Sequence, residues 1–162
     1  MRLGGLDHDR KRVFLLSTTH GAEGHALAAA IETIHVYKRE PVIETLWRQG
    51  KRLADGIEKS IAELKLVGNF RLMGRPCCLT YGTRDHEQNA SQQFRTLFMQ
   101  ETMKGGILAP SLVVSYSHTD RDIDQTLEVI HESLVVYRKA LDEGISKYLT
   151  GRPVKPVFRM FN

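Results

Sequence analysis

Apolar positions spaced three and four residues apart predict two long amphipathic helices in this chain. The first starts at about Pro41, because proline suits the first turn of a helix. The second starts after Thr119. The apolar positions are Ile43, Leu46, Gly50, Leu53, Ile57, Ile61 and Leu64 in the first helix, and Ile123, Leu127, Ile130, Leu134, Tyr137 and Leu141 in the second. We interpret both faces as core rather than as a groove for a partner.

Two shorter helices are predicted beside them. An alanine-rich helix runs from about Gly24 to Lys38, with Leu27, Ile31 and Ile34 on one face. Another runs from about residue 90 to residue 104, buries aromatic and aliphatic side chains, and stops at a glycine pair. Residues 119–122 have the pattern of a capping box, with aspartate in the usual place of glutamate.

Between these helices the hydrophobic period shortens to that of strands. Residues 70–73 alternate, residues 74–76 suggest a turn, and residues 77–81 continue as an extended run, which together predict a hairpin. Residues 107–109 and 112–116 suggest two further short strands. This order favours an α+β fold, with a small antiparallel or mixed sheet covered on one face by helices.

Composition narrows the class of protein. The chain has 162 residues, of which 41% are hydrophobic and 26% charged, which suits one compact domain or a domain plus a fragment of another. The apolar runs are too short to cross a bilayer, no signal peptide is evident, and Cys77 and Cys78 are adjacent, so we expect a cytoplasmic protein. The net charge of +4 is dispersed along the chain, which argues against a nucleic-acid partner.

A polar turn, residues 17–24, precedes the alanine-rich helix. Hydroxyl groups and free backbone N–H groups ahead of a helix can hold an anion such as a phosphate. The same residues can also serve as an ordinary Ser/Thr cap on a core helix. The turn by itself leaves both interpretations open.

Other candidates for chemistry are weaker. His20, His25 and His118 suggest a metal, but no cysteine or carboxylate completes a set of ligands, so we expect no metal site. Cys78 as a nucleophile would need a nearby base. Its place in an apparent strand pair favours a core position instead.

Two groups of motifs, considered together, point to a family. The Ser17–Gly21 turn with its alanine-rich helix is followed, after a long interval, by Gly106–Ser111, Ser115–Asp120 and Asp122–Leu127. This combination resembles the C-terminal part of class III pyridoxal-phosphate (PLP) aminotransferases, with the glutamate-1-semialdehyde 2,1-aminomutase branch as the nearest match. The similarity extends from about Val13 to Glu143.

The resemblance implies a fold-type I enzyme that works as a homodimer and moves an amino group through pyridoxamine phosphate. Residues 1–39 would be the end of the large cofactor domain and the interdomain helix, and residues 40–162 the small domain. In this family the turn contacts the phosphate of PLP bound by the neighbouring subunit, a role that falls on Ser17 and Thr18. The family's Schiff-base lysine lies upstream of this turn, and Lys11 does not match it. We therefore assign no catalytic residue and expect the chain alone to be inactive.

Two departures from the family pattern leave the substrate open. Residues 112–118 contain no acidic side chain where the aminomutases carry a glutamate, and residues 20–24 replace a Ser-Gly-Asn-Pro sequence. An alternative is a non-catalytic α+β association module derived from the same scaffold. If the large domain is missing, Ala26, Ala29, Ala30 and residues 13–16 are the candidates for exposed surface that would drive self-association.

Overall fold

The computed structural model describes residues 23–155, which form parts of two compact units, Met1–Val42 and Ile43–Asn162. The described part of the first unit is essentially one helix, α1 (Gly24–Arg39), in close agreement with the predicted range. No residue of α1 is buried. Leu27, Ile31 and Ile34 lie on its surface with more than half of their area exposed, at 52%, 56% and 53%.

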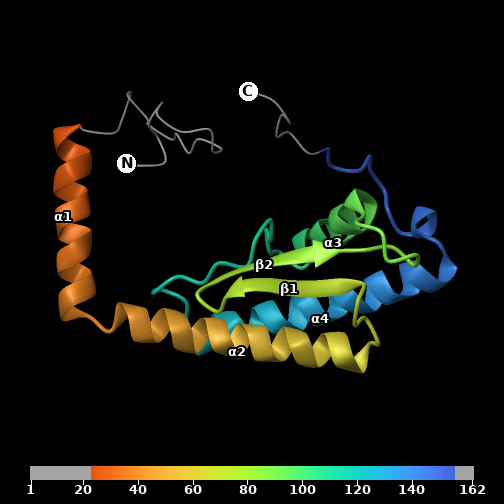
Figure 1. Ribbon diagram of the computed structural model, residues 1–162, viewed down its shortest axis with the longest axis horizontal. Helices are drawn as coiled ribbons and strands as arrows, with labels where there is room; N and C mark the ends of the chain where they lie inside the picture. The colour runs from red at the N-terminus through yellow and green to blue at the C-terminus, as the bar shows by residue number, and fades with distance from the viewer. Residues whose placement is uncertain (1–22, 156–162) are drawn as a thin grey trace, which may run out of the picture. The chain divides into compact units, whose positions relative to one another are not determined.

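The second unit contains the core. Its helices are α2 (Val42–Glu63), which begins at the boundary between the units, α3 (Gln92–Lys104) and α4 (Asp120–Glu143), followed by a short 3-10 turn, η1 (Ile145–Lys147). A hairpin of β1 (Phe70–Arg75) and β2 (Cys78–Thr83) lies between α2 and α3 in the chain (Figure 1). The α+β fold with a small antiparallel sheet is therefore confirmed.

The hairpin has a shorter turn than the sequence suggested. Arg75 pairs with Cys78, so Gly74 and Arg75 belong to β1 and only Pro76 and Cys77 form the turn. Gly74 has a φ of +95°, a conformation that glycine adopts without strain, and a Cβ there would meet the Cys78 carbonyl. The strand pair therefore extends farther toward its turn than alternation alone indicated.

The prediction of strands at residues 107–109 and 112–116 is wrong. In their place a single antiparallel bridge joins Leu79 to Leu112, where the Leu112 N–H donates to the Leu79 carbonyl at 2.9 Å. Pro110 has no N–H to donate, which limits pairing in this segment. The segment nevertheless contributes to the core, because Ala109, Leu112 and Val114 are buried.

Five aromatic rings form the centre of the core. Phe70 stacks on Tyr81 with centroids 5.3 Å apart, and the group is completed by Phe94, Phe98 and Tyr137. The Tyr137 hydroxyl shares its one O–H between the carbonyls of Arg84 at 2.7 Å and Asn69 at 3.0 Å, and its oxygen accepts the Arg84 N–H. Burial raises the pKa of Tyr137, so its hydroxyl remains a donor at neutral pH. One side chain thus ties α4 to the open end of the hairpin, just before β1 and just after β2.

The apolar faces predicted for the two long helices differ in how completely they are buried. Along α4 the face is buried or partly buried throughout, as expected. Along α2 Leu53, Ile57 and Ile61 are buried, whereas Ile43 is 53% exposed. Gly50 faces the Pro76 carbonyl so closely that a Cβ would clash with it, and α2 can therefore lie against the hairpin turn only because this residue is glycine.

Cys78 is exposed, so the prediction that it is a core residue is wrong. Side chains alternate along β2, and the inward positions are Leu79, Tyr81 and Thr83. Cys78 has the opposite parity and faces outward. Among residues 23–155, no helix combines the length and the apolar character needed to cross a membrane.

Candidate functional site

Ser17 and Thr18, the predicted phosphate contacts, lie outside the described residues, as do His20 and residues 13–16. Their role stays a prediction. The second group of motifs, residues 106–127, is described in full and lies where the 107–118 segment meets the start of α4 and the side of α2. We build the candidate site from this junction.

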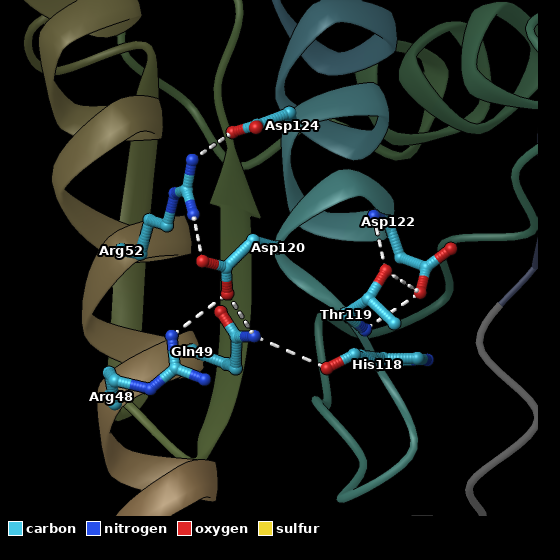
Figure 2. Close-up of polar contacts among 8 residues, drawn as sticks. All are labelled: Arg48, Gln49, Arg52, His118, Thr119, Asp120, Asp122 and Asp124. Atoms are coloured by element: carbon cyan, nitrogen blue, oxygen red, sulfur yellow. Dashed lines mark hydrogen bonds and ion pairs between the residues drawn. The ribbon is translucent and has the colours of Figure 1, made fainter.

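Two arginines on α2 face two aspartates at the start of α4 (Figure 2). Arg48 Nη1 lies 2.8 Å from Asp120 Oδ1. Arg52 reaches Asp120 Oδ2 at 3.1 Å and Asp124 Oδ1 at 2.6 Å. The arginines are four residues apart, and so are the aspartates, so each pair occupies one turn on one helix face. All four side chains remain substantially exposed, which limits the strength of the individual ion pairs.

Gln49 lies under this ion-pair cluster and is 1% exposed. Its Nε2 donates to Asp120 Oδ1 at 2.7 Å and to the His118 carbonyl at 3.2 Å. Both partners are acceptors, which fixes the amide orientation with the nitrogen toward them. The opposite atom, Oε1, has no hydrogen-bond partner among the described residues. A single buried amide thus connects α2 to the segment that leads into α4.

The segment before α4 is also held by its own hydrogen bonds. The Ser115 N–H donates to His118 Nδ1 at 3.1 Å, which requires the tautomer with its proton on Nε2. Thr119 and Asp122 form the predicted capping box: the Thr119 hydroxyl accepts the Asp122 N–H, and Asp122 Oδ2 accepts the Thr119 N–H at 2.7 Å. His118 is exposed, so its Nε2–H is free to meet solvent or a ligand.

The electrostatics keep the carboxylates of this junction ionised. Hydrogen bonds from Arg48 and then Gln49 lower the pKa of Asp120. Hydrogen bonds from Thr119 lower the pKa of Asp122. A carboxylate with a lowered pKa is a poor general base at neutral pH. The arrangement therefore suits positioning of the 112–118 segment rather than proton transfer.

A small cavity of about 200 Å³ adjoins the same segment, and Leu53, Val113, His118 and Thr126 are among its lining residues. Its volume falls below the usual range for a whole ligand or cofactor site. Its polar side chains are Ser111, His118 and Thr126, and the chemistry that they offer is hydrogen bonding through two hydroxyls and an imidazole.

No lysine in the described part of the chain lies in an enclosed pocket. Covalent binding of PLP needs a lysine amine held in an enclosed pocket. Every lysine in the described part of the chain is exposed: Lys38, Lys51, Lys59, Lys65, Lys104, Lys139, Lys147 and Lys155. Within residues 23–155 there is also no group of three or more His, Cys, Asp or Glu side chains that could hold a metal ion.

Sequence reasoning missed Arg48 and Gln49 and gave Arg52 no role. The equal four-residue spacing of Arg48 and Arg52 on one helix and of Asp120 and Asp124 on another was a usable signal. That signal predicts a contact only once the two helices are known to lie together. Gln49 offered no signal, because a polar residue beside the apolar face of a helix is ordinarily solvated.

Comparison with known proteins places this chain beside several enzymes. No protein-family model matches it. It is 26% identical over 133 residues to the 3-aminobutyryl-CoA aminotransferase of Cloacimonas acidaminovorans, a match that covers 80% of this chain and 31% of that protein. It is 31% identical over 120 residues to the glutamate-1-semialdehyde 2,1-aminomutase of Alkaliphilus oremlandii, covering 70% of this chain and 28% of that protein.

A solved structure shares the fold. The PLP internal-aldimine form of the FumI protein of Sphingopyxis sp. MTA144 superposes with a TM-score of 0.62 at 22% identity, over 82% of this chain and 32% of that one. The chain thus spans only about a third or less of the length of the proteins it matches.

Proposed function

We propose a function from one premise: this chain is homologous to class III PLP-dependent aminotransferases and aminomutases, and corresponds to a C-terminal part of them. The resemblance drawn from residues 17–21 and 106–127 is therefore confirmed at the level of the family. The parent family depends on PLP.

The proposed role is that of the small-domain portion of an enzyme that transfers an amino group. Residues 40–162 would form the small domain, and residues 1–39 the end of the large domain with α1 as the interdomain helix. The observation that carries this proposal is the coverage of the alignments, which include most of this chain and a minor part of each relative. A large PLP-binding domain is the partner that such coverage implies.

Ser17 and Thr18 are proposed to contact the phosphate of PLP bound by the neighbouring subunit of a homodimer. PLP supplies the electron sink for amino-group chemistry when it is bound. The residues of this chain would hold its anionic end and form a wall of the active site. The ionised, hydrogen-bonded junction of α2 and α4 would fix the 112–118 segment in that wall.

The first experiment uses the full chain alone. After incubation with PLP and reduction with borohydride, mass spectrometry should find no adduct at one specific lysine, because the described lysines are all exposed. A stoichiometric adduct at one lysine would contradict the proposal that this chain lacks the covalent site.

The second experiment uses a chimera in which this chain replaces the aligned segment of the Alkaliphilus oremlandii aminomutase. The chimera should retain PLP on gel filtration. Ser17→Ala and Thr18→Ala should each raise the dissociation constant for PLP about tenfold, the effect of one lost charge-assisted hydrogen bond. Ser146→Ala, an exposed hydroxyl in η1, is the matched control and should leave the constant unchanged. A folded chimera that does not bind PLP would overturn the proposal.

We propose an amino donor and an amino acceptor as the substrates and name neither compound. The relatives include an enzyme named for 3-aminobutyryl-CoA and several named for glutamate-1-semialdehyde. The 112–118 segment of this chain lacks the acidic residue that the family resemblance implies for the aminomutases, which favours a substrate other than glutamate semialdehyde. Activity of the chimera toward a panel of amino donors would separate these options.

One observation favours the alternative, a non-catalytic association module. The apolar face of α1 is exposed, with Leu27, Ile31 and Ile34 each more than half accessible. Such a face favours contact with another protein surface. Sedimentation of the full chain and of its Ile31→Ser variant tests this alternative. The association module would be favoured if the chain self-associates, the substitution abolishes that self-association, and the chimera binds no PLP.

The free cysteines, Cys77 and Cys78, fit a reducing compartment, and we propose that the protein resides in the cytoplasm.

A further inference from the structure

A second cavity, of about 310 Å³, lies at the hairpin and the start of α3, away from the junction of α2 and α4. Figure 1 shows α3 beside β2 in this part of the molecule. Three arginines line the cavity from three different elements: Arg71 in β1, Arg84 just after β2, and Arg95 in α3. This gathering of positively charged residues around one cavity is the feature that suggests a ligand.

The lining contains no acidic side chain. Within residues 23–155, the ion pairs of arginine involve Arg39, Arg48, Arg52 and Arg138 and none of the three arginines of the cavity. The nearest carboxylate in sequence, Asp85, accepts the N–H groups of Glu87 and Asn89 instead. Like charges around one cavity repel each other, and a bound anion would relieve that repulsion.

Arg95 is already fixed in place for such a role. Its Nη2 donates to the Pro110 carbonyl at 2.8 Å, and its guanidinium carbon lies 4.8 Å from the centre of the Tyr81 ring. Held between a carbonyl and an aromatic face, the guanidinium keeps its charge and has further N–H groups available. Arg71 and Arg84 are exposed and add two further positive charges to the lining.

The start of α3 adds donors to the same cavity. Ser91, its N-cap, accepts the Phe94 N–H through its hydroxyl oxygen, while its own O–H has no acceptor among the described residues. The first turn of α3 has no acidic residue, so the positive end of the helix is not neutralised. Ser91 and Gln92 both line the cavity. This end of the helix therefore reinforces the charge of the arginines.

We propose that this cavity is a binding site for a small phosphorylated organic molecule. Arg71, Arg84 and the start of α3 would bind the phosphate, because guanidinium groups and helix N-termini both favour that anion. The apolar part of the ligand would rest on Met73, which lines the cavity and is 43% exposed. A concave site of this volume favours a small molecule over an acidic segment of another protein. The residues of this site include neither Ser17 nor Thr18, and the proposal does not depend on the proposed function.

The test titrates the ¹⁵N-labelled full chain with phenyl phosphate at low salt, in the absence of PLP, and follows amide chemical shifts. We expect saturable shifts at Thr83, Gln92 and Gln93, and smaller ones with inorganic phosphate, which lacks the apolar part. Arg71→Gln and Arg84→Gln should each weaken binding about tenfold, the effect of one lost charge-assisted hydrogen bond. Neither side chain takes part in the packing described above.

The matched control is Arg75→Gln, which removes an exposed arginine of the same strand that does not line the cavity. It should change the affinity less than twofold. If all three substitutions weaken phenyl phosphate binding equally, the affinity depends only on the net positive charge of the chain and the proposal is overturned. The absence of saturable chemical-shift changes would overturn it as well. Saturable binding of a glutamate-rich peptide at these amides without binding of phenyl phosphate would also overturn it, in favour of a protein-docking surface.

Discussion

Helices α1 and α4 start from similar sequence patterns and end in opposite environments. Both carry apolar residues at helical spacing on one face. In α4 that face lies in the core, and Ile130, Leu134 and Tyr137 are fully buried. In α1 no residue is buried. Spacing thus determines which face of a helix is apolar, whereas the surrounding chain determines whether that face is covered.

The difference has a direct physical reason. The face of α4 meets α2, α3 and the hairpin within its own unit, and burial of its side chains removes apolar surface from water. The unit that contains α1 offers no second described element to pack against it. On the proposed function, the covering surface of α1 belongs to the large domain or to a partner subunit.

The sharpest test of this comparison exchanges isoleucine for alanine in both helices. Ile130→Ala in α4 should lower the free energy of unfolding by about 2–5 kcal/mol, because it leaves a cavity in a packed core. Ile31→Ala in α1, at 56% exposure, should change it by less than about 0.5 kcal/mol. Urea denaturation of the two variants provides the measurement. Equal losses would mean that α1 is packed as tightly as α4.

A smaller effect is expected for the tyrosines of the two helices. Tyr137→Phe removes the hydroxyl that joins α4 to three backbone groups of Asn69 and Arg84. It should cost about 1–3 kcal/mol, since buried polar groups lose their partner. Tyr37→Phe in α1, where the residue is 45% exposed, is the control and should be nearly neutral. Thermal unfolding followed by circular dichroism would compare them, and a neutral Tyr137→Phe would refute the role of this hydroxyl.

The capping box should contribute about 1 kcal/mol. Thr119→Ala removes the side-chain acceptor of the Asp122 N–H and should destabilise α4 by that amount. Thr33→Ala in α1 is the matched substitution: the Thr33 hydroxyl only donates to the Ala29 carbonyl of its own helix, so its loss should be neutral or slightly stabilising. Chemical denaturation at neutral pH measures both. Equal losses in the free energy of unfolding for the two variants would contradict a specific capping role for Thr119.

The smallest effect concerns pH. The pKa of Asp120 is lowered in the folded state, so its ionised form adds stability above the ordinary carboxyl pKa of about 4, and that stability is lost as the pH falls through the lowered value. Asp120→Asn should therefore destabilise the chain slightly at pH 7, and the difference from the wild type should vanish in strong acid.

The control for pH is Glu32→Gln, which removes an ion pair formed within α1, to Arg39. Because this pair joins residues of one exposed helix, its removal should not change the unfolding of the core unit at either pH. Denaturation midpoints of both variants, measured at acid and at neutral pH, show whether the stability lost in Asp120→Asn depends on ionisation of Asp120. A difference for Asp120→Asn that persists at low pH would exclude ionisation as the cause.

Much of the fold was predictable because it depends on nearby residues. The bounds of α1 and α3, the start of α4 with its capping box at Thr119, and the existence of the hairpin all follow from local spacing and local hydrogen bonds. The errors arose where a local pattern permits two structures. The 112–116 segment has strand composition yet forms only the bridge at Leu112, and Cys78 lies one residue out of phase with the core side of β2.

The candidate site was less predictable. The motifs in residues 106–127 identified the family, but they gave no reason to connect them to Gln49, which lies about seventy residues earlier and binds the backbone of His118. The arginines of the second cavity are likewise separated in the chain and appear in the sequence as ordinary surface charges. Only the packing of the hairpin against α3 brings them to one place.

The sequence by itself determined where helices and the hairpin form and how α4 is capped, because both depend on residue order over short distances. Its motifs, taken together, also identified the related enzyme family. Tertiary structure alone decided which apolar face is buried, which way Cys78 points, and which charges meet across α2 and α4. Those outcomes depend on contacts between distant segments, whose energies exist only once the chain has packed.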